Sequence, residues 1–222
     1  MPVSGWNGKF QQVGNGAFAG SIQYAALGEA LRRGYAAAST DTGHTGPGAA
    51  WALGHPEKIA DFGHRAVHET AVHSKSAISN FYGMAPKLSY FTGCSGGGRM
   101  AFQEAQQGWA DPNVSPRSPL MYYDRVVKTV GRKAVDEGMR LFYAPGMGHC
   151  GGGEGPNVFD ALTPLEQWRE QGKPPSSILA THSTAGKVDR SRPLCPYPQI
   201  ARYKGTGSID QAENFSCAAP AE

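Results

Sequence analysis

The strongest pattern of apolar positions in the chain begins after Pro56. Apolar residues from Ile59 to Phe81 recur mainly every three or four positions, which is the spacing of one face of an α-helix. Proline is favoured in the first turn of a helix, and glycine directly after the last turn. The sequence therefore predicts a long helix from Pro56 to near Gly83, with its apolar face on a sheet.

Shorter patterns fill most of the remaining chain. Four apolar runs bounded by turn residues predict strands, at residues 9–13, 35–40, 88–92 and 139–143. Three other segments are helical in pattern: residues 99–106, 118–130 and 160–171. From Pro174 onward we expect mostly irregular chain, held by Cys195 and Cys217. Strands that alternate with helices predict an α/β fold with a mostly parallel sheet flanked by helices.

Length and charge narrow the class of protein. The 222 residues suffice for one well-packed core and show no linker, so we expect a single domain over residues 1–222. The net charge of +3 is spread without a basic cluster, which argues against nucleic acid or an anionic membrane as a partner. No apolar run reaches the roughly 18 residues of a membrane-spanning helix.

The cysteines suggest where the protein resides. The four cysteines lie in surroundings rich in glycine and proline, which favours disulfides and an oxidising compartment. We expect a secreted or periplasmic protein whose leader is absent from this chain, because residues 1–20 contain no signal-peptide core. Four reduced cysteines are the alternative. Metal ligation is disfavoured because no Cys-x-x-Cys occurs, and we expect no cofactor.

The candidate chemistry lies in two short glycine-rich motifs. The segment 93–98 follows a predicted strand and precedes a helix, which is the context of the strained turn that presents a nucleophilic serine. Its Ser95 is a poor nucleophile until an imidazole takes its proton, and His149 is the candidate base. Cys94 and Cys150 adjoin these two residues. A disulfide between the cysteines would therefore hold serine and histidine close together. This pair indicates a serine hydrolase.

Several segments together resemble the tannase and feruloyl esterase family, which includes hydrolases of mono(hydroxyethyl) terephthalate. They span nearly the whole chain in the family's order: residues 6–10, 14–20, 39–44, 61–66, 93–99, 108–112, 146–150 and 192–198. The resemblance implies an α/β-hydrolase fold with Ser95 as nucleophile, His149 as base and Asp111 as the acid that orients the imidazole. It also implies an oxyanion hole made by backbone N–H groups of Gly96 and of the loop Gly14-Asn15-Gly16.

The identity of the acid stays open at this stage. Asp111 in Trp109-Ala110-Asp111-Pro112 is also compatible with a turn whose aspartate caps the next helix. Asp124 or Asp136 could then orient the imidazole instead.

One departure from the family concerns its lid domain, which lies between nucleophile and acid and holds a calcium ion. Only sixteen positions separate Ser95 from Asp111, so we expect a reduced fold without lid or calcium site, and with broad substrate selection. A helix that continues to Gln106 makes the return to Asp111 difficult, since four extended residues span at most roughly 13 Å. We therefore expect a monomer or a homodimer that exchanges this segment.

The remaining candidates are structural in this interpretation. His64 and His68 have helical spacing but no third ligand, and they are expected to be surface histidines rather than a metal site. Asp41 and His44 are expected to stabilise a loop as a pair. The resemblance implies a carboxylic ester hydrolase for small aromatic esters, such as feruloyl, galloyl or terephthalate half-esters. A non-catalytic, lidless scaffold that binds small aromatics, or a peptidase, is the alternative.

Overall fold

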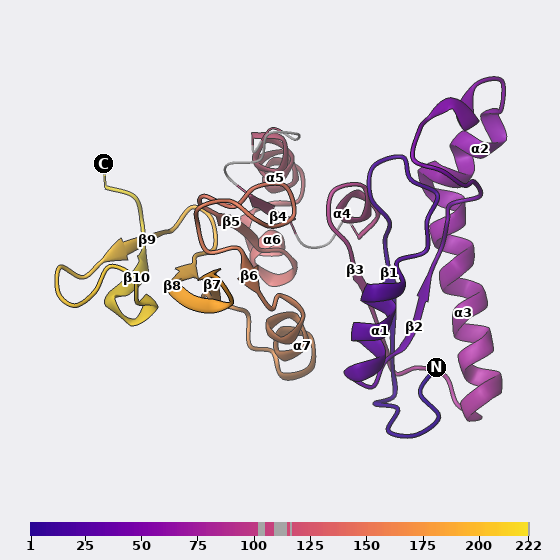
Figure 1. The fold of residues 1–222 in the computed structure, drawn as a ribbon, viewed down its shortest axis with the longest axis horizontal. Coiled ribbons are helices and arrows are strands. Elements are labelled where there is room, and N and C mark those ends of the chain that lie inside the picture. Colours follow the sequence, from indigo (N-terminus) through magenta and orange to yellow (C-terminus); the bar gives the residue numbers. More distant parts are fainter. Residues whose placement is uncertain (102–104, 109–114, 116, 222) are drawn as a thin grey trace. The chain divides into compact units, whose positions relative to one another are not determined.

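The computed structural model describes residues 1–101, 105–108, 115 and 117–221. The chain forms two compact units, Met1–Phe102 and Gln103–Glu222, and both helices and parallel strands are present, as expected for an α/β fold (Figure 1). The single-domain organisation stays a prediction.

The first unit is built on three parallel strands. Its elements are β1 (Lys9–Val13), α1 (Tyr24–Arg32), β2 (Ala36–Ser39), η1 (Ala50–Ala52), α2 (Pro56–Ala60), η2 (Asp61–Arg65), α3 (Ala66–Tyr82), β3 (Leu88–Thr92) and α4 (Gly96–Ala101). The strand order is β2-β1-β3, and α1 and α3 lie on opposite sides of the strands (Figure 1). Phe10, Ala36 and Ile78 form a core cluster between the sheet and α3.

The carboxyl ends of these strands meet at one edge of the sheet. Val13 is in register with Ser39 on one side and with Thr92 on the other. In open parallel sheets, ligand and catalytic sites lie beyond this edge, where the strand order reverses. The residues that follow the three strands, from Gly14, Thr40 and Gly93, therefore lie together at the edge where a site is expected.

The long helix predicted from Pro56 to near Gly83 is confirmed. Pro56 is the first residue of α2, and Gly83 ends α3 with a left-handed φ of 71°. Between α2 and α3 the helix widens into a single π-helical turn, η2, which the apolar spacing did not indicate.

The second unit combines helices with small sheets. Its elements are β4 (Ala105–Gly108), α5 (Arg117–Val130), α6 (Arg132–Gly138), β5 (Leu141–Ala144), β6 (Val158–Phe159), α7 (Leu162–Gln171), β7 (Ile178–Thr184), β8 (Lys187–Leu194), β9 (Ile200–Tyr203), η3 (Ala212–Asn214) and β10 (Phe215–Ala218). β4 pairs in parallel with β5, whereas β6-β7-β8 and β9-β10 are antiparallel. One core cluster lies under α5 and α6 and contains Tyr123, Val135 and Leu141.

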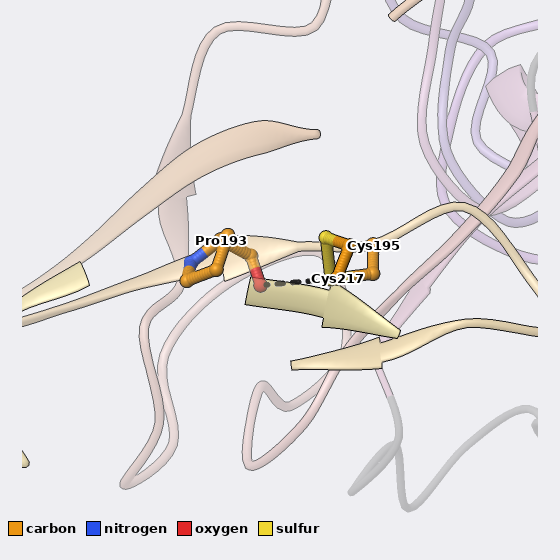
Figure 2. Close-up of a disulfide and its surroundings, with 3 residues drawn as sticks. All are labelled: Pro193, Cys195 and Cys217. Atoms are coloured by element: carbon orange, nitrogen blue, oxygen red, sulfur yellow. Dashed lines mark hydrogen bonds between the residues drawn. A yellow bond between two sulfur atoms is a disulfide. The ribbon is translucent and has the colours of Figure 1, made fainter. Parts of the chain in front are cut away.

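A disulfide fastens the end of this unit. Cys195, directly after β8, bonds to Cys217 in β10 with the Cα atoms 5.5 Å apart (Figure 2). Beside this bond, Tyr197 N–H donates to the Leu141 carbonyl at 2.8 Å. The cross-link and this hydrogen bond tie the C-terminal strands to β5.

Two expectations about secondary structure are wrong. The helix predicted over residues 99–106 ends at Ala101 in α4, and β4 begins at Ala105. Pairing with β5, where Ala105 lies opposite Leu141, overrides the local helical preference. The argument for segment exchange assumed a helix to Gln106, so that premise fails.

The chain after Pro174 is also more regular than expected. It contains the four strands β7 to β10, and the hairpin between β7 and β8 turns at Ala185 and Gly186, both with positive φ. Among the described residues, no helix combines the length and the apolar character that a membrane span requires.

Candidate active site

Ser95 lies at the tip of a sharp turn between β3 and α4. Its φ is 55°, a left-handed conformation that costs a non-glycine residue on the order of 1 kcal/mol and persists where surrounding structure enforces it. The turn is closed by Gly97 N–H, which donates to the Cys94 carbonyl at 2.9 Å. A serine held in this way between a strand and a helix has the geometry of a nucleophile elbow.

Glycines around Ser95 allow the backbone to pack without side chains. A Cβ added at Gly97 would lie 2.7 Å from the Asn15 carbonyl oxygen, and one added at Gly14 would lie 2.6 Å from Gly97 Cα. At Gly93 the added Cβ would lie 2.5 Å from the Gly97 carbonyl carbon. No real Cβ approaches this closely, so the turn needs glycine at all three positions.

The structure brings the loop 14–16 against the turn that carries Ser95. A Cβ at Gly96 would lie 2.9 Å from the Ala17 carbonyl oxygen, which shows how close the two backbones are. Gly14 N–H donates to the Thr92 carbonyl at 2.9 Å, and the buried Asn15 donates through Nδ2 to Thr42 Oγ1 at 3.3 Å. The predicted oxyanion residues of this unit therefore lie side by side, and their role stays a prediction.

His149 belongs to the second unit, in the loop that follows β5. Met147 N–H donates to the Ala144 carbonyl at 3.2 Å, and Gly148 N–H donates to the Gly152 carbonyl at 3.0 Å. Met147 is 5% exposed and packs in a cluster with Phe142. This side chain anchors the loop two residues before the half-buried His149.

The cysteine next to His149 shows the same kind of strain as Ser95. Cys150 has a φ of 62° and is exposed. Among the described residues none of the cysteines is a free thiol. Ser95 and His149 belong to different units, so their pairing, and that of Cys94 with Cys150, stays a prediction.

The candidate acids that the structure describes differ in their exposure and in their contacts. Asp111 lies outside the described residues. Asp136 is exposed on α6 and pairs with Arg132 at 3.9 Å. Asp124 is half-buried on α5, and its charge contributes to the environment of Tyr143 on β5.

Tyr143 has the most perturbed ionisation near the His149 loop. Burial raises its pKa from 10.0 to about 12, with smaller contributions from Tyr197 and from the negative charge of Asp124. The phenol is therefore neutral at any pH where an ester hydrolase works, and it cannot serve as a base there.

Three further histidines and Asp41 are candidates from the sequence, and their surroundings indicate structural roles. His64 and His68 are exposed, and the described part of the chain holds no group of three or more metal-ligating side chains. Asp41 accepts from Gly43 N–H at 2.9 Å, whereas His44 contacts Phe18 and Thr42. Both residues stabilise loops, each through its own partners. The contact of His44 with the loop 14–18 was missed because no local motif signals it.

Comparison with known proteins gives the family. The sequence model described as "Tannase and feruloyl esterase" matches residues 1–107 and 105–218. The chain is 46% identical over 127 residues to mono(2-hydroxyethyl) terephthalate hydrolase from Piscinibacter sakaiensis. This alignment covers 56% of this chain and 20% of that protein. It is 40% identical over 102 residues to a probable feruloyl esterase B-1 from Aspergillus terreus, over 46% of this chain and 19% of that protein.

These matches span about a fifth of the length of the curated relatives. A crystal structure of an esterase from Aspergillus oryzae matches with a TM-score of 0.89 at 18% identity, over 97% of this chain and 85% of that chain, and supports the fold. The family model covers nearly the whole chain, and a serine on a strained strand-to-helix turn lies in the expected segment. The chain belongs to the tannase and feruloyl esterase family.

Proposed function

We propose that the chain is a carboxylic ester hydrolase that works through an acyl-enzyme on Ser95. The observation that carries this proposal is the left-handed φ of 55° at Ser95, between β3 and α4, in a member of this family. Such strain at an exposed turn is typical of a serine presented for attack.

In the proposed reaction, His149 takes the Ser95 proton as the hydroxyl oxygen attacks the ester carbonyl. His149 then gives the proton to the leaving alcohol, which leaves the acyl group on Ser95. In the second half of the reaction, His149 takes a proton from a water molecule as its oxygen attacks the acyl carbonyl, and gives that proton to the Ser95 oxygen as the acid is released. Asp111 orients the imidazole. Backbone N–H groups of Gly96 and of the loop 14–16 stabilise the oxyanion, and one such donor typically lowers the barrier by about 3 kcal/mol.

We further propose that a disulfide between Cys94 and Cys150 holds nucleophile and base together. Closing a loop of this length stabilises a folded chain by about 4 kcal/mol in the chain-entropy model. The proposal is supported by strain on both sides of the proposed bond: Ser95, next to Cys94, and Cys150 itself both have a left-handed φ. Peptide mapping without reductant would identify the cross-linked pair.

The proposed substrates are small esters of aromatic acids. This class is suggested by the relatives named for terephthalate and feruloyl esters. Because only sixteen positions separate Ser95 from Asp111, no lid domain can lie between them, and we infer weak selection among acyl groups. We also propose a monomer in a secreted or periplasmic location, where the Cys195–Cys217 disulfide is stable.

Hydrolysis of p-nitrophenyl acetate and methyl ferulate tests the proposal. We expect Ser95→Ala to lose activity by at least about 10³-fold, because removing a nucleophile leaves only residual catalysis. Ser89→Ala is the matched control, since Ser89 is exposed on the same strand β3. A wild-type chain that binds these esters without turnover would support a non-catalytic scaffold instead, and cleavage of peptides alone would support a peptidase.

A further inference from the structure

The loop beside Ser95 is held in a conformation that it would not adopt alone. We call residues 14–18 the oxyanion loop. Ala17 has a φ of 48°, and Thr42, on the loop after β2, has a φ of 61°. Left-handed backbone at alanine and threonine persists only where neighbouring groups enforce it. Two residues of the segment 42–46, Thr42 and His44, make hydrogen bonds to the oxyanion loop.

His44 fastens the C-terminal end of the oxyanion loop. The residue is 8% exposed, and its Nε2 lies 2.7 Å from the Phe18 carbonyl oxygen. A carbonyl only accepts hydrogen bonds, so Nε2 carries the proton and donates. Next to this bond, Gly20 N–H donates to the Gly46 carbonyl at 3.0 Å, and Gly20 has no space for a side chain against the His44 backbone.

Thr42 fastens the other end of the same loop. It is 1% exposed, and its Oγ1 accepts from Asn15 Nδ2 at 3.3 Å and donates to the Asp41 carbonyl at 2.6 Å. The same oxygen lies 3.4 Å from His44 Nδ1. Thr42 and His44 thus contact each other and reach Asn15 and Phe18, with Gly16 and Ala17 between these two attachment points.

The imidazole of His44 is itself clamped by aromatic rings. It stacks on Trp51 with the ring centroids 4.2 Å apart and the planes 24° from parallel. Phe62 packs against both of these rings, with its centroid 5.2 Å from that of Trp51. The ring therefore has little freedom to leave the Phe18 carbonyl.

We propose that His44 is a positioning residue that sets the oxyanion loop against the Ser95 turn, so that its N–H groups point at the developing charge. This inference rests on the proposed esterase function. A displacement of about 1 Å in a group that contacts the reacting atoms can lower the rate by about 10²-fold. The contact should therefore affect kcat rather than substrate affinity.

His44→Phe separates the hydrogen bonds from the stacking, because it keeps a ring on Trp51 but removes both ring nitrogens. We expect kcat for p-nitrophenyl cinnamate to fall about 10- to 100-fold, less than for loss of a complete oxyanion donor, with little change in KM. His44→Gln, whose amide can donate to Phe18, should retain most of kcat. His55→Phe, at an exposed histidine of the same unit, is the control and should resemble the wild type.

A spectroscopic readout distinguishes positioning from general destabilisation. Hydrogen bonds to the carbonyl oxygen of the acyl-enzyme lower its infrared stretching frequency, so the band should move to higher frequency in His44→Phe and stay in place in His55→Phe. An unchanged kcat, or a lower kcat with an unmoved band, would overturn the inference. If His44→Phe does not fold, the same two readouts are taken on Thr42→Val, which loses the hydroxyl that contacts Asn15 and His44. A lower kcat with a band at higher frequency would support the inference, and a wild-type kcat or an unmoved band would overturn it. A wild-type chain without ester hydrolysis would instead refute the proposed function.

Discussion

The nucleophile side and the base side of the proposed site are held by different kinds of contact. Around Ser95, the backbones of Gly14, Gly93 and Gly97 touch so closely that no Cβ fits. Around His149, the loop is held by backbone hydrogen bonds and by the buried side chain of Met147. Steric exclusion has no intermediate state, whereas anchoring by one side chain weakens gradually. Substitutions of the residues that hold each side in place should therefore lower activity sharply on the first side and gradually on the second.

The strain is also distributed differently on the two sides. In the turn between β3 and α4 the strained residue is the proposed nucleophile itself, whereas in the loop after β5 it is Cys150, the neighbour of the proposed base. The serine must be presented at one fixed angle, which the parallel strands and α4 impose. The imidazole needs only a stable loop and an orienting carboxylate.

The largest effect is expected from Asp111, the proposed orienting carboxylate. Asp111→Asn should lower kcat by about 10⁴-fold, because an asparagine favours the wrong imidazole tautomer. Asp124→Asn is the matched control and should retain wild-type turnover. Steady-state kinetics with p-nitrophenyl esters provide the measurement, and the opposite ranking of the two variants would assign the role to Asp124.

The next largest effect should come from steric disruption on the nucleophile side. In Gly97→Ala the new methyl group would lie 2.7 Å from the Asn15 carbonyl oxygen, so the turn and the oxyanion loop must separate. We expect kcat/KM to fall by at least about 10²-fold. At Gly98 the nearest atom to an added Cβ is the Gly93 carbonyl oxygen at 3.4 Å, so Gly98→Ala should be nearly neutral. Equal activity of both variants would contradict the steric account.

On the base side we expect a graded loss. Met147→Ala removes a side chain that is 5% exposed in its cluster, which should cost about 2–4 kcal/mol of unfolding free energy. Activity should then decline at lower temperature than in the wild type, but it should persist in the cold. Met121→Ala, at a residue that is 56% exposed, should change stability by less than about 0.5 kcal/mol. Denaturant unfolding and activity measured against temperature test this pair.

The smallest effect concerns alkaline pH. The pKa of Tyr143 is raised from 10.0 to about 12 by burial, so its contribution to stability is complete below pH 10 and is lost as the pH rises through 12. Tyr143→Phe should therefore lose less stability than the wild type over that interval. Tyr122→Phe, at a residue that is 36% exposed, should follow the wild type. Denaturant unfolding at several alkaline pH values provides the measurement. A loss of stability in Tyr143→Phe as large as that of the wild type would contradict the prediction.

The sequence predicted local features better than pairings between distant segments. The helix from Pro56 to Gly83 and the turn at Ser95 were visible because periodicity and glycine spacing are local signals. The strand β4 was mistaken for helix because only its pairing with β5 makes it a strand. The hairpin of β7 and β8 was missed because β8 reads Lys-Val-Asp-Arg-Ser-Arg-Pro-Leu, without a clear alternation of apolar residues.

The same distinction holds within the candidate site. Gly14, Gly93 and Gly97 belong to recognisable motifs, and their close contacts follow from the parallel strands that precede the two glycine-rich segments. The bond from His44 to the Phe18 carbonyl spans 26 positions and joins two loops. Such a contact depends on how the loops cross at the edge of the sheet, which residue types alone do not determine.

Labelling with a fluorophosphonate tests most directly whether Ser95 and His149 form one site. The probe forms a stable bond to a serine only when a base activates the hydroxyl. We predict that peptide mass spectrometry finds the label on Ser95, and that His149→Ala slows labelling by at least about 10³-fold while the chain stays folded. Label on another residue, or an equal labelling rate in the two chains, would contradict the account.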